Sequence, residues 1–194
     1  MQSPINPRVT FFIDHSNVCH RLIEMKKIDK NWVRWYNPEE LAKELARGRQ
    51  IIKINFYCAP PPSYLLQDGG IYERMYWKQM SYYEEIKKLP NVELKYARLS
   101  GVKGDLHEKN LDTQLGTDLI VQATSNQYDT VVLISNDGDY VSAVEAVKLL
   151  GRRVELVYFP QRLSWDLRKM CDMAIRARRK FFKELNFSVN ANTP

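Results

Sequence analysis

The chain has 194 residues and a formal net charge of +6, with 29 Lys and Arg against 23 Asp and Glu. This length is sufficient for one domain with a sizeable core, and no apolar run approaches the ~20 residues that span a bilayer. The first residues, MQSPINPR, lack the basic and then apolar pattern of a signal peptide, so we expect a soluble cytoplasmic protein without membrane contact.

Predicted strands and helices alternate along the chain. Apolar runs that end in turn residues predict strands at 8–13, 50–59, 91–99, 130–135 and 153–159. The spacing of apolar residues and the capping residues predict a first helix that ends near residue 27. They predict further helices at 38–47, 71–89, 109–124, 140–150, 163–170 and 173–185. Such alternation indicates an α/β domain with a parallel sheet and helices on both faces. We expect one domain over residues 1–186 and a disordered tail at 187–194.

Acidic residues follow two of the predicted strands. Asp14 follows the first strand, and Asp137 and Asp139 follow the fourth in the segment ISNDGDY. Capping of a turn or helix is the ordinary role of a single aspartate at such a place. In open α/β sheets, however, ligands bind at the carboxyl edge of the strands. Asp112, in the first turn of the helix after the third strand, is expected at the same edge.

A cluster of carboxylates requires a neutralising partner, because like charges repel strongly at short range. Carboxylate and water ligands suit Mg²⁺ or Mn²⁺, which also bind substrate phosphate oxygens. Asn17 and Ser135 could position a water or a phosphate by hydrogen bonding, and turn capping is their alternative role. The sequence therefore predicts a site for Mg²⁺ or Mn²⁺.

Other chemistries leave no motif in the sequence. The absence of GxxxxGK[ST] and GxGxxG disfavours a P-loop and a dinucleotide fold, and the absence of GxSxG with scattered histidines disfavours a serine triad. The cysteines are Cys19, Cys58 and Cys171; they are odd in number and lack the spacing of zinc ligands, so they indicate neither a disulfide framework nor a zinc site.

The excess positive charge lies near the C-terminus. Between residues 162 and 183 there are eight Lys and Arg against two Asp, whereas basic and acidic residues balance in the rest of the chain. A solvated helix face is the most frequent explanation of such a run, and nucleic-acid binding is the functional one. The candidate nucleic-acid-binding residues are Arg176, Arg178, Arg179 and Lys180.

Three segments resemble the motifs of NYN domains, the PIN-like nucleases that include the LabA-like proteins. FFIDHSN (11–17) is similar to the family's hydrophobic-D-G-x-N opening, KNLDTQLGTDLI (109–120) to K-G-V-D-x-x-L-x-x-D, and ISNDGDY (134–140) to S-G-D-G-D-F. The three segments occur in the family's order. His15, Asn110 and Asn136 stand where the motifs have glycine.

The resemblance implies a PIN-like three-layer sandwich with a central parallel sheet of strand order 3-2-1-4-5. It also implies a metal-dependent ribonuclease, with catalytic residues at Asp14, Asp112, Asp137 and Asp139. By position, the metal ligands are Asp14, Asp112, Asp118, Asp137 and Asp139, with Asn17, Ser135 and Lys109 as accessories. Asp118 lies ~9 Å along and ~120° around a helix from Asp112, so support of the site and an ordinary helix position both stay open for it.

These observations favour a ribonuclease that acts on single-stranded RNA with Mg²⁺ or Mn²⁺. One alternative is a catalytically inert RNA-binding or regulatory module on the same fold. Another is a Mg²⁺-dependent phosphatase with a small substrate. The basic C-terminal stretch disfavours this alternative, because it suits a polymeric anion better than a small one. The sequence leaves the RNA target, the mode of cleavage and the oligomeric state open.

Overall fold

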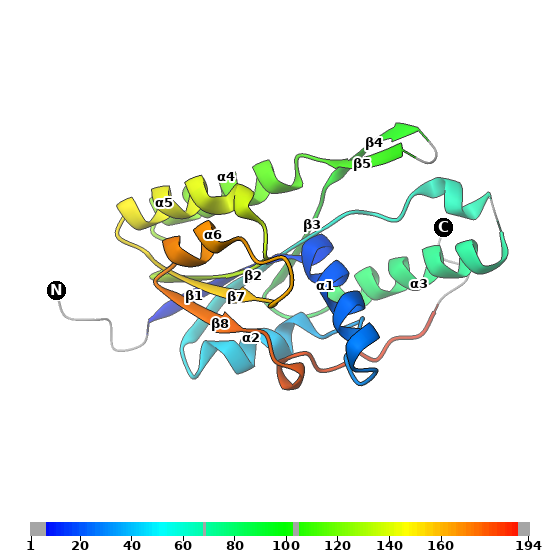
Figure 1. Ribbon diagram of the computed structural model, residues 1–194, viewed down its shortest axis with the longest axis horizontal. Helices are drawn as coiled ribbons and strands as arrows, with labels where there is room; N and C mark the ends of the chain where they lie inside the picture. Colours follow the sequence, from blue (N-terminus) through cyan, green and yellow to red (C-terminus); the bar gives the residue numbers. More distant parts are fainter. Residues whose placement is uncertain (1–6, 68, 103–104, 190–194) are drawn as a thin grey trace.

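The computed structural model describes residues 7–67, 69–102 and 105–189, and within residues 98–109 it describes the backbone alone. Six parallel strands form the central sheet in the order β3-β2-β1-β6-β7-β8 (Figure 1). They are β1 (Arg8–Asp14), β2 (Gln50–Cys58), β3 (Val92–Tyr96), β6 (Thr130–Ile134), β7 (Arg153–Tyr158) and β8 (Met173–Arg176). The predicted order of the first five strands, 3-2-1-4-5, is confirmed, and a sixth strand extends the sheet.

Helices cover both faces of the sheet and complete a three-layer architecture (Figure 1). One face packs against α1 (His15–Ile28), α2 (Pro38–Ala46) and α3 (Gly70–Lys87). The other face packs against α4 (Leu111–Thr124), α5 (Val141–Leu149) and α6 (Trp165–Met170). Short 3-10 helices are η1 (Ser63–Leu66), η2 (Gly138–Tyr140) and η3 (Arg179–Phe181).

The central strands β1 and β6 explain why their sequences are almost continuously apolar. Both are covered on two faces, so residues of either parity along the strand are buried. On β1, Phe11 and Ile13 join the core under α1, α2 and α3, whereas Phe12 joins the core under α4 and α5. Ile13 pairs with Ile134 across the two strands, so the residues that follow them meet at the carboxyl edge.

The prediction of a helix at 173–185 is wrong. Met173–Arg176 forms β8, which pairs in parallel with Glu155–Tyr158 of β7, and η3 follows it. Ile175 of β8 packs against the core. Pairing with an open sheet edge and burial of this side chain outweigh the local helix preference of the sequence, which is a weak determinant by itself.

The predicted third strand also differs from the observed one. It ends at Tyr96, and the chain then forms an antiparallel hairpin of β4 (Arg98–Val102) and β5 (Asp105–Lys109), in which Arg98 pairs with Lys109. The predicted loop at 100–108 is therefore largely part of this hairpin, and α4 begins at Leu111, two residues later than predicted.

Among helices of the described ranges, none combines the length and the apolar character required to cross a membrane. Of the predicted tail, residues 190–194 lie outside the described residues, and Phe187 packs against the rings of Trp35 and Tyr82. The domain boundary at residue 186 stays a prediction.

Candidate metal centre

Three carboxylates from separate elements meet at the carboxyl edge of the sheet. Asp14 ends β1, Asp112 lies in the first turn of α4, and Asp137 follows β6. Each offers a carboxylate oxygen within 4.8 Å of those of the other two. The parallel pairing of β1 with β6 and the packing of α4 over them produce this convergence. The structure thus brings together three of the five residues predicted as metal ligands.

Asp14 is buried, with 2% of its surface exposed. One carboxylate oxygen accepts a hydrogen bond from the backbone N–H of Asn17 at 3.0 Å, and the other accepts from the hydroxyls of Ser135 at 3.0 Å and Tyr140 at 3.2 Å. These donors are all neutral. Burial, with a contribution from the charge of Asp112, raises the pKa of Asp14 to about 7.

The three carboxylates form no ion pair with a described cation, although Arg21 and Arg162 line a cavity together with Asp137. No ion pair between described side chains involves Asp14, Asp112 or Asp137. Burial also raises the pKa of Asp112, and the charges of Asp137 and Asp139 add to this effect. Carboxylate oxygens are hard ligands, and three of them without an ion-pair partner among the described residues form a donor set that fits a divalent cation such as Mg²⁺.

Tyr140 joins two of the carboxylates and was not predicted as a site residue. Its hydroxyl lies 2.9 Å from Asp112 Oδ1 and 3.2 Å from Asp14 Oδ2. A phenol has one proton, so it donates to only one of two ionised carboxylates at a time. Burial and the two carboxylates raise the pKa of Tyr140, which keeps this proton in place. The signal was present in the sequence, where ISNDGDY has tyrosine at the position of the motif's phenylalanine.

Asn17 and Ser135 hold the turn after β6. The side-chain oxygen of Asn17 accepts a hydrogen bond from the backbone N–H of Asn136 at 3.1 Å. Ser135 Oγ accepts from the backbone N–H of Asp137 at 3.1 Å while its hydroxyl donates to Asp14. The capping role that the sequence left open for these two residues is therefore observed, and it fixes the positions of two carboxylates.

Two of the three residues that replace motif glycines are held by their surroundings. Asn136 donates to the backbone oxygens of Phe159 and Gln161 and accepts from the N–H of Phe159, which ties the β6 turn to the end of β7. The ring of His15 packs beside that of Phe56 with centroids 4.7 Å apart, and burial lowers its pKa to about 3. His15 is therefore a neutral core residue.

Asn110 occupies the third glycine position, directly before α4. Its backbone has φ of 69°, in the left-handed region. Glycine adopts this conformation without steric cost, and asparagine is one of the few other residues found there regularly. The replacement therefore keeps the backbone conformation from which α4 begins.

Asp118 and Asp139 lie outside the group of three carboxylates. Asp118 accepts a hydrogen bond from the Tyr57 hydroxyl at 2.7 Å and forms an ion pair with Lys95 at 2.6 Å. Asp139 is exposed, and its backbone N–H donates to Asp137 at 3.1 Å. Metal ligation by either residue stays a prediction. The side chain of Lys109 lies outside the described residues.

The candidate nucleic-acid-binding residues lie beside α2. Lys180 Nζ is 3.6 Å from Glu44, and Arg179 is 3.9 Å from Asp29. Arg176, Arg178 and Lys180 line a cavity of about 440 Å³ together with Glu44. Part of this positive charge is thus balanced by nearby acids, and binding of nucleic acid here stays a prediction.

The chain is similar to one protein-family model and to solved structures. The NYN domain model matches residues 8–178. No curated protein matches the chain. A crystal structure of a protein of unknown function from Vibrio parahaemolyticus is similar, with a TM-score of 0.69 and 16% sequence identity over 94% of this chain and 99% of that chain. At this identity the similarity concerns the fold.

Proposed function

The chain belongs to the NYN domain family, a family of nucleases, and on this premise we propose that it is a metal-dependent ribonuclease that hydrolyses phosphodiester bonds of single-stranded RNA. One observation carries the proposal: Asp14, Asp112 and Asp137 gather within 4.8 Å of one another, and the buried Asp14 has neutral hydrogen-bond donors only among the described residues. An arrangement of this kind disfavours the charged state of its own carboxylates unless a cation binds.

In this proposal Asp14, Asp112 and Asp137 hold Mg²⁺ or Mn²⁺. The ion would supply an activated water and neutralise charge on the phosphate under attack. Ser135 and Asn17 keep Asp14 and the β6 turn in position through the hydrogen bonds described above. The charge of Asp139 contributes to the raised pKa of Asp112, so the two carboxylates lie near each other. Because the carboxylate of Asp139 is also exposed, it is proposed to orient a water beside Asp112.

Asp118 is proposed to support the site without touching the metal. Its contacts with Lys95 on β3 and Tyr57 on β2 anchor α4 to the sheet, and α4 carries Asp112. Lys109 precedes α4, and its side chain is proposed to add a positive charge for a substrate phosphate.

The test is cleavage of an end-labelled, unstructured RNA with EDTA, Mg²⁺ or Mn²⁺. Asp14→Asn, Asp112→Asn and Asp137→Asn should each lose cleavage and remain folded, since the substitution is nearly isosteric. Asp166→Asn, an exposed aspartate in the first turn of α6, is the matched control and should cleave like the parent.

Three results would contradict the proposal. An RNA complex that forms without cleavage under any metal would indicate the inert RNA-binding module. Release of phosphate from p-nitrophenyl phosphate, with RNA left intact, would indicate the small-substrate phosphatase. Cleavage that survives EDTA and the three substitutions would exclude the carboxylate cluster as the active site.

We also propose a peripheral RNA contact on the C-terminal basic stretch. It comprises Arg176, Arg178, Arg179 and Lys180. Replacing all four with Gln should weaken RNA binding and leave turnover at saturating RNA largely intact, because such contacts position the strand without entering the chemistry. Equal binding by the variant and the parent would remove this surface from the proposal.

A further inference from the structure

A groove runs between α1 and α3 beside the carboxyl edge of the sheet. Its inner part has a volume of about 390 Å³ and is lined by His15 of α1 and by Pro60, Pro61 and Pro62 after β2. Its outer part has a volume of about 530 Å³ and is lined by residues that include Met75 of α3. Both parts share the lining residues Ile23, Arg34, Trp35 and Gln79. The two parts therefore adjoin and form one groove.

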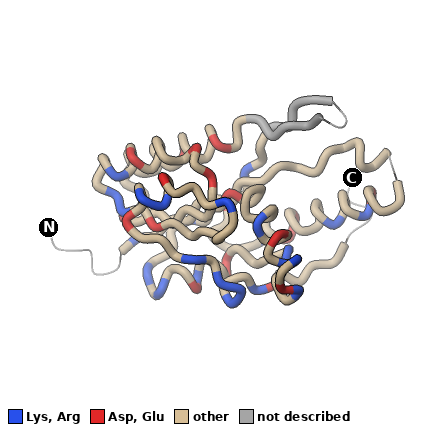
Figure 2. The backbone as a smooth tube through the Cα atoms, in the orientation of Figure 1, with Lys and Arg blue, Asp and Glu red and all other residues tan. Residues whose placement is uncertain are grey.

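Four cations line the outer part of this groove, and among the described residues Glu184 is its one acidic lining residue. They are Lys26, Lys27, Arg34 and Lys78. None of them forms an ion pair with an acidic side chain that the structure describes. They come from α1, the loop after it and α3, elements whose basic residues can be followed in Figure 2. The groove therefore has a net positive charge that favours a polyanion.

Other lysines on the same layer of helices form ion pairs, unlike the lysines of the groove. Lys43 on α2 lies 2.8 Å from Glu39, and Lys87 and Lys88 at the end of α3 each lie 2.6 Å from a glutamate. These ion pairs follow the helical spacing of three or four residues, so the helix balances its own charge. Lys78 lies on the same helix as Lys87, but it lines the groove and forms no ion pair with a described side chain.

We propose that the groove between α1 and α3 binds the single-stranded RNA segment that adjoins the scissile phosphate, with Lys26, Lys27 and Lys78 on its phosphates. The inner end of the groove lies next to the carboxylate cluster, because its lining residue His15 directly follows Asp14. That the bound RNA continues from the groove to the scissile phosphate rests on the proposed nuclease function. Binding itself does not require cleavage.

The lining of the groove favours single strands over duplexes. Besides the cations, it has apolar and aromatic walls that include Leu65, Met75 and Trp35. The guanidinium of Arg34 lies over the Trp35 ring, 4.6 Å from its centroid, which presents a flat cationic surface. Unpaired bases stack on aromatic rings and guanidinium planes, whereas a duplex buries its bases and is bound through its backbone and shape.

The test is RNA binding measured by fluorescence anisotropy in EDTA, so that no cleavage occurs. The groove variant carries Lys26→Gln, Lys27→Gln and Lys78→Gln, which are all exposed lysines. The matched control carries Lys43→Gln, Lys87→Gln and Lys88→Gln, so that both variants lower the net charge by the same amount. Thermal unfolding should show both variants folded like the parent.

The groove variant should bind an unstructured RNA roughly 10-fold to 100-fold more weakly at 0.1 M salt. Its slope of log K against log salt should become shallower by about 2, because each phosphate contact of a single strand contributes about 0.7. The control should keep most of the affinity and the slope of the parent. A duplex of the same length should show a much smaller difference between the two variants.

Several outcomes would overturn all or part of the inference. Equal losses in the groove variant and the control would show that net charge alone matters, and equal losses with duplex and single strand would remove the preference for single strands. The outcome for the nuclease is separate. A chain that cleaves RNA while the groove variant binds like the parent would refute the groove alone, whereas weaker binding by the groove variant without cleavage by the parent would refute the nuclease alone.

Discussion

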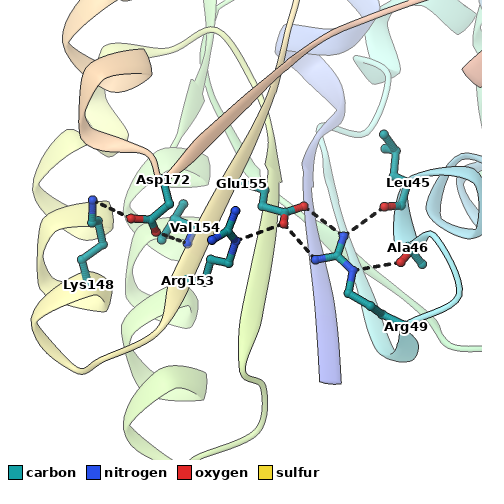
Figure 3. Close-up of polar contacts among 8 residues, drawn as sticks. All are labelled: Leu45, Ala46, Arg49, Lys148, Arg153, Val154, Glu155 and Asp172. Atoms are coloured by element: carbon teal, nitrogen blue, oxygen red, sulfur yellow. Dashed lines mark hydrogen bonds and ion pairs between the residues drawn. The ribbon is translucent and has the colours of Figure 1, made fainter. Parts of the chain in front are cut away.

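Two buried carboxylates of the central sheet have different partners. Glu155 on β7 is 3% exposed and accepts hydrogen bonds at 2.9 Å from both terminal nitrogens of Arg49, and Arg153 adds a contact at 3.3 Å (Figure 3). Asp14 on β1 is 2% exposed, and the donors that the structure describes around it are neutral. The two residues are almost equally buried, so burial does not distinguish them.

The difference between these two carboxylates supports a structural role for Glu155 and the proposed functional role for Asp14. Arg49 also donates to the backbone oxygens of Ala46 and Leu45, so the pair with Glu155 fastens the end of α2 to β7 (Figure 3). Asp172 is similarly paired with Lys148 of α5 at 2.9 Å. Asp14 caps α1 and accepts hydrogen bonds from neutral donors, but it has no charged partner among the described residues, so its charge remains available to a ligand. Burial without a counter-charge destabilises an ion, so its occurrence beside two further carboxylates indicates a function.

The largest expected effect is on cleavage. Asp14→Asn should lower the rate of RNA cleavage with Mg²⁺ at least about 1,000-fold, which is about 4 kcal/mol of activation free energy. Glu155→Gln should change the rate by less than about 3-fold at a temperature where the variant is folded, because its partners are distant from the cluster. Similar losses in both variants would show that the loss reflects the fold and not the chemistry.

The second effect concerns stability and has opposite signs at the two sites. Glu155→Gln should lower the free energy of unfolding by about 3 kcal/mol, because it leaves the Arg49 charge without its partner. Asp14→Asn in EDTA should leave that free energy unchanged or raise it, because it removes an unpaired buried charge. Urea unfolding of both variants measures this difference. Destabilisation of the two variants to the same extent would contradict the assigned roles.

The third effect is the pH dependence of stability without metal. The pKa of Asp14 is about 7 in the folded protein and near 3.8 in the unfolded chain, so the folded state binds the extra proton between these values. The contribution of Asp14 to stability should therefore be greatest below about pH 4 and fall towards pH 7, by at most about 1.4 kcal/mol per pH unit. Asp14→Asn should flatten the curve, and Mg²⁺ should restore stability most strongly near pH 7. A metal-free curve equal in the parent and the variant would contradict the assignment.

The smallest effect separates two further aspartates. Asp139→Asn should impair cleavage more than Asp118→Asn, because Asp118 is already neutralised by Lys95 and Asp139 has an exposed carboxylate close to the cluster. Asp118→Asn should instead lower the free energy of unfolding by about 1 kcal/mol through the half-buried pair with Lys95. Cleavage rates with Mg²⁺ and urea unfolding test both statements, and an equal loss of cleavage at both positions would show that Asp118 reaches the metal.

The sequence by itself determined five of the six strands of the central sheet and the gathering of the carboxylates. Apolar runs such as TFFI and TVVLI predict strands buried on two faces, and parallel strands end at a common edge. Asp14 and Asp137 follow such runs directly, so their proximity follows from the strand pairing alone. Asp112 follows in the same way from its place in the first turn of a helix that begins at this edge.

The tertiary structure alone decided which charges are paired. Asp118 and its partner Lys95 are 23 residues apart, and Glu155 and Arg49 are 106 apart, so no local pattern indicates these pairs. The cations of the groove likewise come from separate segments, whereas the basic stretch visible in the sequence lies partly beside acids of α2. The helix predicted at 173–185 was wrong for a related reason, because β8 exists through its pairing with β7. Local sequence determines the preferences of a segment, but charge neutralisation and edge pairing depend on distances between segments that only the folded chain defines.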